Sequence, residues 1–215
     1  VDKSASVKKD GISSQIAGMI KLDDVAAPAI KKFVRRAIDR LDADEIENLV
    51  DNLYQTRDAI REKIELLLAE HRRKTFKQWL HSNIIKLKGH YTFIDKITLR
   101  DELIGIDKGL YVAEESVNGF EYDAIAAIAD NPNVLFWHRN RERKDFVING
   151  FINHYPDFIV KMRSGMTLLI ETKGDHLANA ETADKLWLGN KWADLAGDNY
   201  KYFMVFQSKE VDGAI

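Results

Sequence analysis

The hydrophobic pattern changes its period near residue 90, and this change limits the chain to a fold in two parts. Before that point apolar residues recur at helical spacing, as in the stretch from residue 46 to residue 68. After it, short runs rich in β-branched and aromatic residues alternate with helical segments. We therefore expect a helical bundle or arm over residues 1–89 and a second domain over residues 90–215.

The helical part is expected to contain three helices. The first ten residues are expected to be mobile, because they are terminal and rich in Lys, Ser and Asp. Acidic and basic residues occupy the side of each helix opposite its apolar stripe. We find no internal repeat in this part. The expected helices cover residues 23–40, residues 43–68 and residues 71–83.

The second part is expected to form a mixed sheet flanked by helices, which is an α/β architecture. Its segments follow the order helix, several strands, helix, strand. The last helix should end at Gly197, which fits the glycine that commonly follows a helix C-terminus. The expected strands are VLFWHRN, DFVINGFI, YPDFIVKM, MTLLIET and YKYFMVFQ, with further β-favouring runs over residues 86–100.

Composition excludes several classes of protein. The chain has no cysteine, so it has neither disulfides nor thiolate metal sites, and a cytoplasmic location is the natural expectation. No apolar run approaches the roughly 20 residues that a membrane span needs. The formal net charge of −2 means that nucleic acid would have to be bound through a local basic patch.

One stretch, YPDFIVKMRSGMTLLIETKGD, places charged residues at the ends of two apolar runs. Glu171 and Lys173 are two residues apart and so share one face of a strand. Ser164 and Gly165 form a turn between the runs. If the runs pair as an antiparallel hairpin, Asp157 lies beside Glu171 and Lys173.

Two carboxylates held close together repel each other, and a divalent cation relieves that repulsion. Hard oxygen ligands without Cys suit Mg²⁺ or Mn²⁺. Such a metal activates water and stabilises charge on a phosphoryl oxygen, and a neighbouring lysine can orient the water or hold the phosphate. The alternative reading is a solvated strand end with a surface ion pair.

These residues resemble the PD-(D/E)XK nuclease superfamily, which has the restriction-endonuclease-like fold. Pro156-Asp157 matches the first element and Glu171-Thr172-Lys173 the second. The longer segment NGFEYDAIAAIADNPNVLFWHRN, followed by YPDFIV and LLIETKGD, is similar to the C-terminal nuclease domain in the restriction (Res) subunit of type III restriction enzymes. The resemblance covers residues 107–206, and the helical part is similar to the connector ahead of that domain.

The resemblance implies a role for each matched residue. Asp157, Glu171 and the backbone carbonyl of Thr172 would bind Mg²⁺ or Mn²⁺, and Lys173 would position the attacking water or stabilise the pentavalent phosphate. Glu121 would assist through the water shell of the metal. Its alternative is a helix N-terminal acid favoured by the helix dipole.

A basic segment and one later lysine are candidates for DNA contact, with a solvated turn as the alternative for the segment. His154 and His176 flank the expected site, and we leave both out of the metal shell. The candidate DNA-binding residues are Arg139, Asn140, Arg141, Arg143, Lys144 and Lys185.

The expected function is a metal-dependent endonuclease that hydrolyses phosphodiester bonds of double-stranded DNA in a type III restriction-modification system. The chain carries no G-x-x-x-x-G-K-[ST] motif, so no ATP site is expected. Together with a start at Val1, this favours a C-terminal fragment. Expected partners are the helicase or translocase region of the same subunit and the modification methyltransferase subunit. The alternatives are a non-catalytic module that binds DNA or a partner, and a repair nuclease of the same fold.

Overall fold

The computed structural model describes residues 3–87, 89, 91–99, 103–174 and 180–207, with side chains from residue 8 onward. The chain consists of two compact units, Val1–Thr75 and Phe76–Ile215, named here the helical unit and the α/β unit. The division lies within a helix, whereas the sequence places it after residue 89. Phe76 and Leu80 account for the difference, because both side chains are buried in the core of the α/β unit.

The helical unit is built from α1 (Lys3–Met19), α2 (Ala27–Asp39), α3 (Ala43–Asp51) and the first part of α4 (Leu53–His81). Its helices share one apolar core, and the stripes that the sequence predicts point into it. The buried residues of this core are Ile12, Ile16, Ile20, Ile30, Val34, Ile38, Ile46, Leu49 and Ile64.

Residues 3–10, which the sequence predicts to be mobile, belong to helix α1. The expected helix over residues 43–68 is interrupted at Asn52, whose backbone leaves the helical region at φ −116° and ψ 36°. The side-chain amide of Asn52 donates to the carbonyl and the side-chain oxygen of Asn48, at 3.0 and 2.7 Å. The Asn52 backbone N–H also donates to the Asn48 carbonyl, at 3.1 Å. Beyond this break, α4 continues through the expected third helix to His81.

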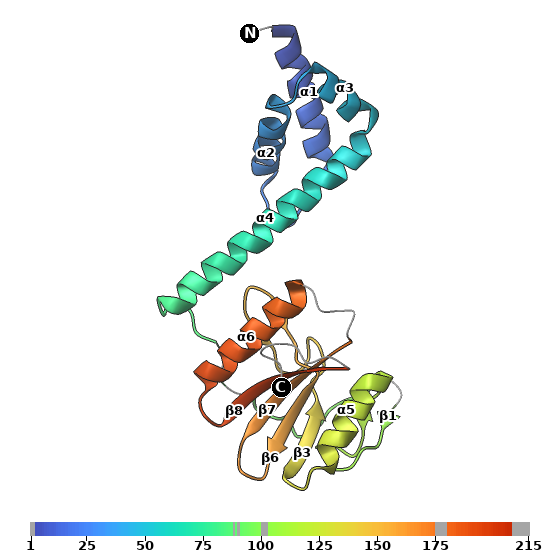
Figure 1. The fold of residues 1–215 in the computed structure, drawn as a ribbon, viewed down its shortest axis with the longest axis vertical. Helices are drawn as coiled ribbons and strands as arrows, with labels where there is room; N and C mark the ends of the chain where they lie inside the picture. The colour runs from blue at the N-terminus through green and yellow to red at the C-terminus, as the bar shows by residue number, and fades with distance from the viewer. Residues whose placement is uncertain (1–2, 88, 90, 100–102, 175–179, 208–215) are drawn as a thin grey trace. The chain divides into compact units, whose positions relative to one another are not determined.

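The α/β unit contains a four-stranded mixed sheet with the order β3-β6-β7-β8, which confirms the α/β architecture (Figure 1). The antiparallel pairs are β3–β6 and β6–β7, and β7 pairs with β8 in parallel. The parallel step is made by a crossover through a helix. The strands are β3 (Val134–Arg139), β6 (Phe158–Met162), β7 (Thr167–Lys173) and β8 (Tyr200–Phe206).

Each face of this sheet is covered by a helix. Phe158 and Val160 pack in the cluster that contains residues of α5 (Gly119–Asp130). Ile159, between them, packs in the cluster that contains residues of α6 (Ala180–Ala196). This alternation is the two-residue period of a strand with both faces buried. Gly197 has φ +105° just beyond α6, so the predicted helix end is confirmed.

The segment before the sheet differs from the expected strands. The described residues between 84 and 99 form no regular strand, although Tyr91 and Phe93 pack against the core. The alternation of apolar and polar residues in this segment therefore reflects contact of the apolar side chains with the core, and the described part of the segment does not pair with another strand. The expected strand DFVINGFI is reduced to β4 (Ile148–Asn149), which pairs with β5 (Asn153–His154).

The short strands β1 (Leu103–Ile104) and β2 (Glu114–Glu115) form a separate antiparallel pair. Across the described residues, no helix combines the length and the apolar composition that a membrane span requires.

Candidate active site

The β6–β7 hairpin brings the two ends of the conspicuous stretch together. Gly165 takes φ +93° in the turn, a conformation that favours glycine. The register pairs Phe158 with Ile170, so one step further Asp157 falls opposite Glu171. The predicted hairpin, with Asp157 next to the end of the second strand, is confirmed.

Asp157 is fixed to the end of β7 through its side chain. Its Oδ2 accepts hydrogen bonds from the Thr172 backbone N–H at 2.6 Å and from the Thr172 hydroxyl at 2.7 Å. The Asp157 carbonyl accepts from the Asn140 backbone N–H at 2.9 Å. Because both side-chain bonds fall on Oδ2, Oδ1 is left for another partner.

Glu171 and Lys173 share a face of β7, as their spacing predicts. Lys173 Nζ lies 2.7 Å from Glu171 Oε1. Lys185 of α6 is the second cation here, with Nζ at 3.7 Å from Glu171 Oε1 and at 3.1 Å from Glu181 Oε1. Burial lowers the pKa of Lys185, but Glu171 and Glu181 outweigh it and raise the pKa overall. Two ammonium groups thus converge on one oxygen of Glu171.

The other oxygen of Glu171 is unusual. Oε2 is buried and has no hydrogen-bond partner, and the residue is 2 % exposed. Burial, followed by the charge of Asp157, raises the pKa of Glu171 to about 7 in spite of the two lysines. A buried carboxylate oxygen without a donor is costly. A cation bound between Asp157 and Glu171 would remove that cost.

These residues line an open polar cavity of about 630 Å³. Its wall mixes both signs of charge, which suits a phosphate together with a cation better than an apolar ligand. The charged lining residues are Glu115, Arg139, Arg141, Glu142, Lys144, Asp157, Glu171, Lys173, Glu181 and Lys185.

The donors fit a hard cation with water ligands. The Lys173 carbonyl accepts from the Gln207 N–H on the β8 side at 3.2 Å, whereas the Thr172 N–H points to Asp157. Since the N–H and C=O of one residue point to the same side of a strand, the Thr172 carbonyl also faces the Asp157 side. No set of three or more His, Cys, Asp or Glu ligands occurs among the described residues. Two carboxylates and a carbonyl are the kind of set that Mg²⁺ completes with water.

Glu121 serves as an N-terminal helix cap. It forms a capping box with Asn118 at the start of α5, and Arg139 Nη1 lies 3.9 Å from its Oε2. Burial and then the charge of Asp157 raise the pKa of Glu121. The helix-cap alternative is therefore realised, and Arg139, which lines the cavity, links Glu121 to the site.

The residues of the basic segment divide into buried and accessible ones. Asn140 is buried, and its amide donates to the carbonyls of Phe146 and Pro156, each at 2.8 Å. Arg141 is also buried and paired in two bonds with Asp145. Both residues line the cavity, but their side-chain polar groups are used to hold the loop.

The remaining cations of the segment differ in exposure. Arg139 lines the cavity but donates to the Ser116 carbonyl. Lys144 lines the cavity and lies 3.5 Å from Glu115. Arg143 has a side chain 85 % exposed and pairs with Glu142, and it does not line the cavity.

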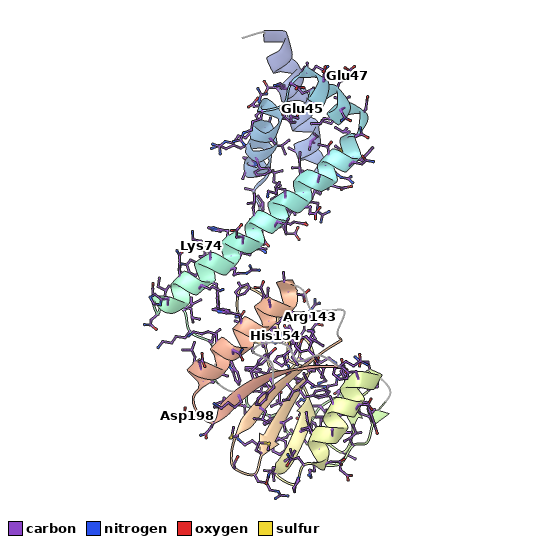
Figure 2. The ribbon with its side chains drawn as sticks, viewed as in Figure 1. Glu45, Glu47, Lys74, Arg143, His154 and Asp198 are labelled. Carbon is purple, nitrogen blue, oxygen red and sulfur yellow. The ribbon has the colours of Figure 1, made fainter. Side chains whose placement is uncertain are left out.

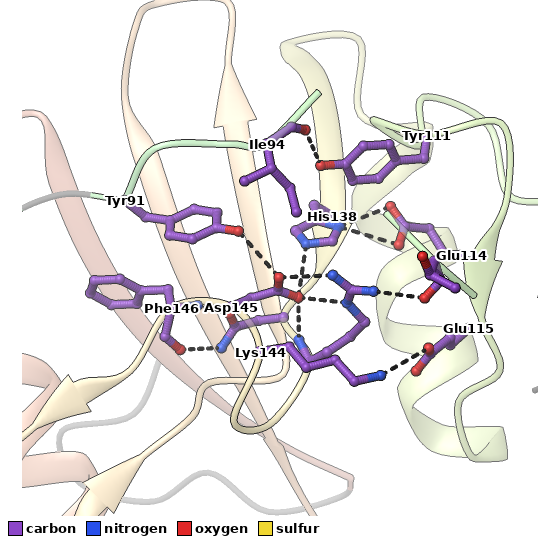
Figure 3. Close-up of polar contacts among 12 residues, drawn as sticks. Tyr91, Ile94, Tyr111, Glu114, Glu115, His138, Lys144, Asp145 and Phe146 are labelled. Atoms are coloured by element: carbon purple, nitrogen blue, oxygen red, sulfur yellow. Dashed lines mark hydrogen bonds and ion pairs between the residues drawn. The ribbon is translucent and has the colours of Figure 1, made fainter. Parts of the chain in front are cut away.

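A buried charge network beside the site was not expected from the sequence (Figure 3). His138 Nδ1 lies 3.1 Å from Glu114 Oε1, and its Nε2 lies 3.3 Å from Asp145 Oδ2. Tyr91 donates to Asp145 Oδ1 at 3.2 Å, and Arg141 completes the set. Burial alone lowers the pKa of His138, but the bonds to Asp145 and Glu114 outweigh it and raise the pKa. A signal was present in the polar His138, which follows four apolar residues of β3, but nothing local identified Glu114 as its partner.

His154 lies inside the α/β unit (Figure 2). It is fully buried, and its Nε2 lies 2.9 Å from the Tyr202 hydroxyl. Burial, followed by the charges of Lys185 and Lys173, lowers its pKa to about 3. His154 is therefore a neutral core residue, and His176 lies outside the described residues.

Comparison with protein-family models, with curated proteins and with solved structures finds no match to this chain. The chemistry of the site is therefore argued from its own residues. Those residues are two carboxylates, two lysines and a strand carbonyl around one polar cavity.

Proposed function

We propose that this chain is a metal-dependent endonuclease that hydrolyses phosphodiester bonds of double-stranded DNA. One observation carries the proposal. Glu171 holds a buried oxygen without a hydrogen-bond donor, next to Asp157 and Lys173, on the wall of an open polar cavity. The mixed sheet with a helix on each face supports assignment to the restriction-endonuclease-like fold.

Asp157, Glu171 and the Thr172 carbonyl would hold Mg²⁺ or Mn²⁺. When bound, the metal would lower the pKa of a water ligand and stabilise charge on the phosphoryl oxygens. The chain supplies the rest of the geometry. The two bonds from Thr172 to Asp157 Oδ2 fix that carboxylate on β7. Glu121, at the start of α5, would be a partner of metal-bound water.

Lys173 has the position needed to orient the attacking water or to hold a non-bridging phosphate oxygen. Its ammonium group is held 2.7 Å from Glu171 Oε1, so it stays within reach of a group bound at the carboxylates. Lys185 adds a second positive charge from α6. A compact ammonium is a suitable partner for a phosphate oxygen.

Phosphates flanking the cleaved bond would be held by accessible cations of the cavity wall. Lys144 and Arg139 line the cavity, and exposed Arg143 is a further contact outside it. Asn140 and Arg141 act indirectly, by holding the loop and the Pro156–Asp157 step in place. Contacts of this kind supply affinity without reading the sequence.

The system we propose for this nuclease is a type III restriction enzyme. The helicase or translocase region of the restriction subunit and the modification methyltransferase subunit would be its partners, acting in the cytoplasm. A repair nuclease of the same fold and a non-catalytic DNA-binding module are the competing assignments.

The proposal is tested by incubating the purified chain with plasmid DNA and Mg²⁺ or Mn²⁺. We expect cutting by the parent, and none by Asp157→Asn or Lys173→Ala. The matched controls are Asp198→Asn, an exposed turn residue, and Lys161→Ala, a lysine at the opposite end of the same hairpin. Equal cutting by the parent and both site variants would refute the assignment.

Metal binding provides an independent readout that requires no turnover. Mn²⁺ at about a hundredfold excess over its dissociation constant should stabilise the parent by about 2.7 kcal/mol in thermal unfolding. Asp157→Asn should abolish this stabilisation, and Asp198→Asn should retain it. An equal response of all three proteins would place the metal elsewhere.

A further inference from the structure

The helical unit carries a row of unpaired positive charges. Lys32, Arg36 and Arg40 follow one another at intervals of four residues along α2 and its C-cap, where Arg40 keeps helical backbone angles. Residues at this spacing are neighbours on a helix surface. All three are exposed, and among the described residues none of them takes part in an ion pair or a side-chain hydrogen bond. We name these three residues the α2 basic row.

A neighbouring basic residue of the same helix differs from this row, because it is paired with acidic residues. Arg35, one step along the same helix, pairs with Asp10 and with Asp39. Residues 27–40 contain five basic residues and one acidic residue, whereas residues 42–51 contain five acidic residues and no basic one. Figure 2 labels Glu45 and Glu47 on this acidic helix, α3. Charge is therefore segregated between consecutive helices.

Helix stability explains only part of the α2 basic row. Cations near a helix C-terminus interact favourably with the helix dipole, which accounts for Arg36 and Arg40. Lys32 lies in the middle of α2, outside the range of that effect. Like charges four residues apart repel each other, so Lys32–Arg36 and Arg36–Arg40 are two destabilising pairs.

The other face of α2 limits the choice of partner. Ile30, Val34 and Ile38 are buried in the core of the helical unit. A helix that binds a membrane surface inserts a free apolar face beside its basic one, and α2 has no such face to offer. A regular line of point charges with no apolar neighbour instead fits the phosphates of a nucleic acid.

We propose that the α2 basic row is a second, sequence-independent DNA-binding surface, separate from the catalytic cavity. Only the choice of duplex DNA as the occupant rests on the proposed function. Lys32, Arg36 and Arg40 each contact a backbone phosphate.

The test uses the full chain, a labelled mixed-sequence duplex and buffer with EDTA, so that binding is measured without cutting. Fluorescence anisotropy is recorded across a salt series. Replacing Lys32, Arg36 and Arg40 by Ala should weaken binding and reduce the slope of log affinity against log salt by about 3, or about 1 per lost phosphate contact. Single Lys32→Ala, which leaves the helix C-terminus intact, should reduce it by about 1. Circular dichroism confirms that the variants are folded.

A matched control removes three exposed cations of α4, Arg61, Lys63 and Lys74, and should leave the slope unchanged (Lys74 is labelled in Figure 2). Exchanging Lys for Arg and Arg for Lys across the α2 basic row should retain binding, because point charges are kept. An unchanged slope in the row variant, or an equal loss in the control, would overturn the proposal.

Two further outcomes would also overturn it. In one, the triple Ala variant loses binding to phosphatidylserine vesicles but keeps DNA binding. In the other, only its self-association changes. Since no cutting is measured, a fall in the salt slope supports this surface even if the plasmid assay shows no nuclease. If the plasmid assay shows cutting but the salt slope does not fall, the nuclease assignment stands and the second DNA-binding surface is rejected.

Discussion

The α/β unit contains two clusters of buried charge that are built in opposite ways. Around Asp145, the two carboxylate oxygens receive bonds from Tyr91, Arg141 and His138. Around Glu171, one oxygen pairs with two lysines and the other has no donor. Burial raises the pKa of both carboxyls. At Asp145 the bonds from His138 and Arg141 outweigh burial and hold the pKa well below its usual range, whereas at Glu171 the pKa rises to about 7.

This difference separates a structural cluster from a site. A fully satisfied buried network fixes the chain locally and favours one conformation. A buried carboxyl with a raised pKa and a free oxygen in a cavity is typical of a functional site. Substitutions in the Asp145 cluster should therefore destabilise the fold, whereas Glu171→Gln should stabilise it when metal is absent.

The largest effect is expected for Asp145→Asn. The substitution removes the counter-charge of Arg141 and His138, whose side chains are 7 % and 0 % exposed. Breaking a buried pair from one side typically costs about 3–5 kcal/mol. Urea unfolding should show a loss of that size, and Asp198→Asn is the exposed control. A loss no larger than that of the control would mean that the network contributes little.

Glu171→Gln should raise the free energy of unfolding when metal is absent, whereas Asp145→Asn lowers it. A carboxyl whose pKa moves from 4.5 to about 7 loses roughly 3 kcal/mol of folding stability when it ionises. The folded state binds this proton more tightly than the unfolded state, so the contribution falls as pH rises from 4.5 to about 7. The variant lacks this fall and should be more stable than the parent by about 1–3 kcal/mol near pH 8.

The measurement is the difference in unfolding free energy between parent and variant across pH, with EDTA present. The comparison with the parent is needed because His154 also makes stability depend on pH. Its pKa is lowered from 6.5 to about 3, so its contribution to stability rises with pH over an overlapping range. Both proteins contain His154, and its contribution cancels in the difference. A variant less stable than the parent at every pH would show that Glu171 is a satisfied structural residue.

The smallest effect is expected for Tyr91→Phe, which removes one of several bonds to Asp145. The hydroxyl donates to Oδ1 at 3.2 Å, and Arg141 still binds the same oxygen at 3.0 Å. We expect a loss of about 1 kcal/mol. Tyr122→Phe on the exposed side of α5 is the control. A loss as large as that of Asp145→Asn would mean that the network depends on each single bond.

The sequence predicts the β6–β7 hairpin well because its signals are local. Strand alternation, a turn glycine and two-residue spacing suffice to place Asp157 beside Glu171 and Lys173. The same reasoning predicts the C-terminal end of α6 at Gly197. It does not predict the break at Asn52, where the backbone leaves the helical region within a continuous amphipathic pattern.

The roles of the basic segment were harder to predict because burial is a property of the tertiary fold. Arg141 and Arg143 look equivalent in the sequence, yet Arg141 is buried against Asp145 and Arg143 is exposed. Their difference depends on contacts with distant positions, among them the Thr98 carbonyl, which accepts from Arg141 at 3.2 Å. The pairing of Glu114 with His138 spans 24 residues, and no local pattern announces it.

The amide of Asn140 has a consequence for how this protein can be altered. It accepts from the Phe146 N–H and donates to the Phe146 carbonyl, each at 2.8 Å, so that one side chain ties both ends of the intervening loop together. It also binds the Pro156 carbonyl next to Asp157. Asn140 therefore closes the loop at its base, and the Arg141 carbonyl closes its tip by accepting from the Lys144 and Asp145 N–H groups at 3.2 and 3.0 Å. Because Glu142 and Lys144 of this loop also line the cavity, an insertion between Glu142 and Arg143 would disturb the cavity wall as well as the turn.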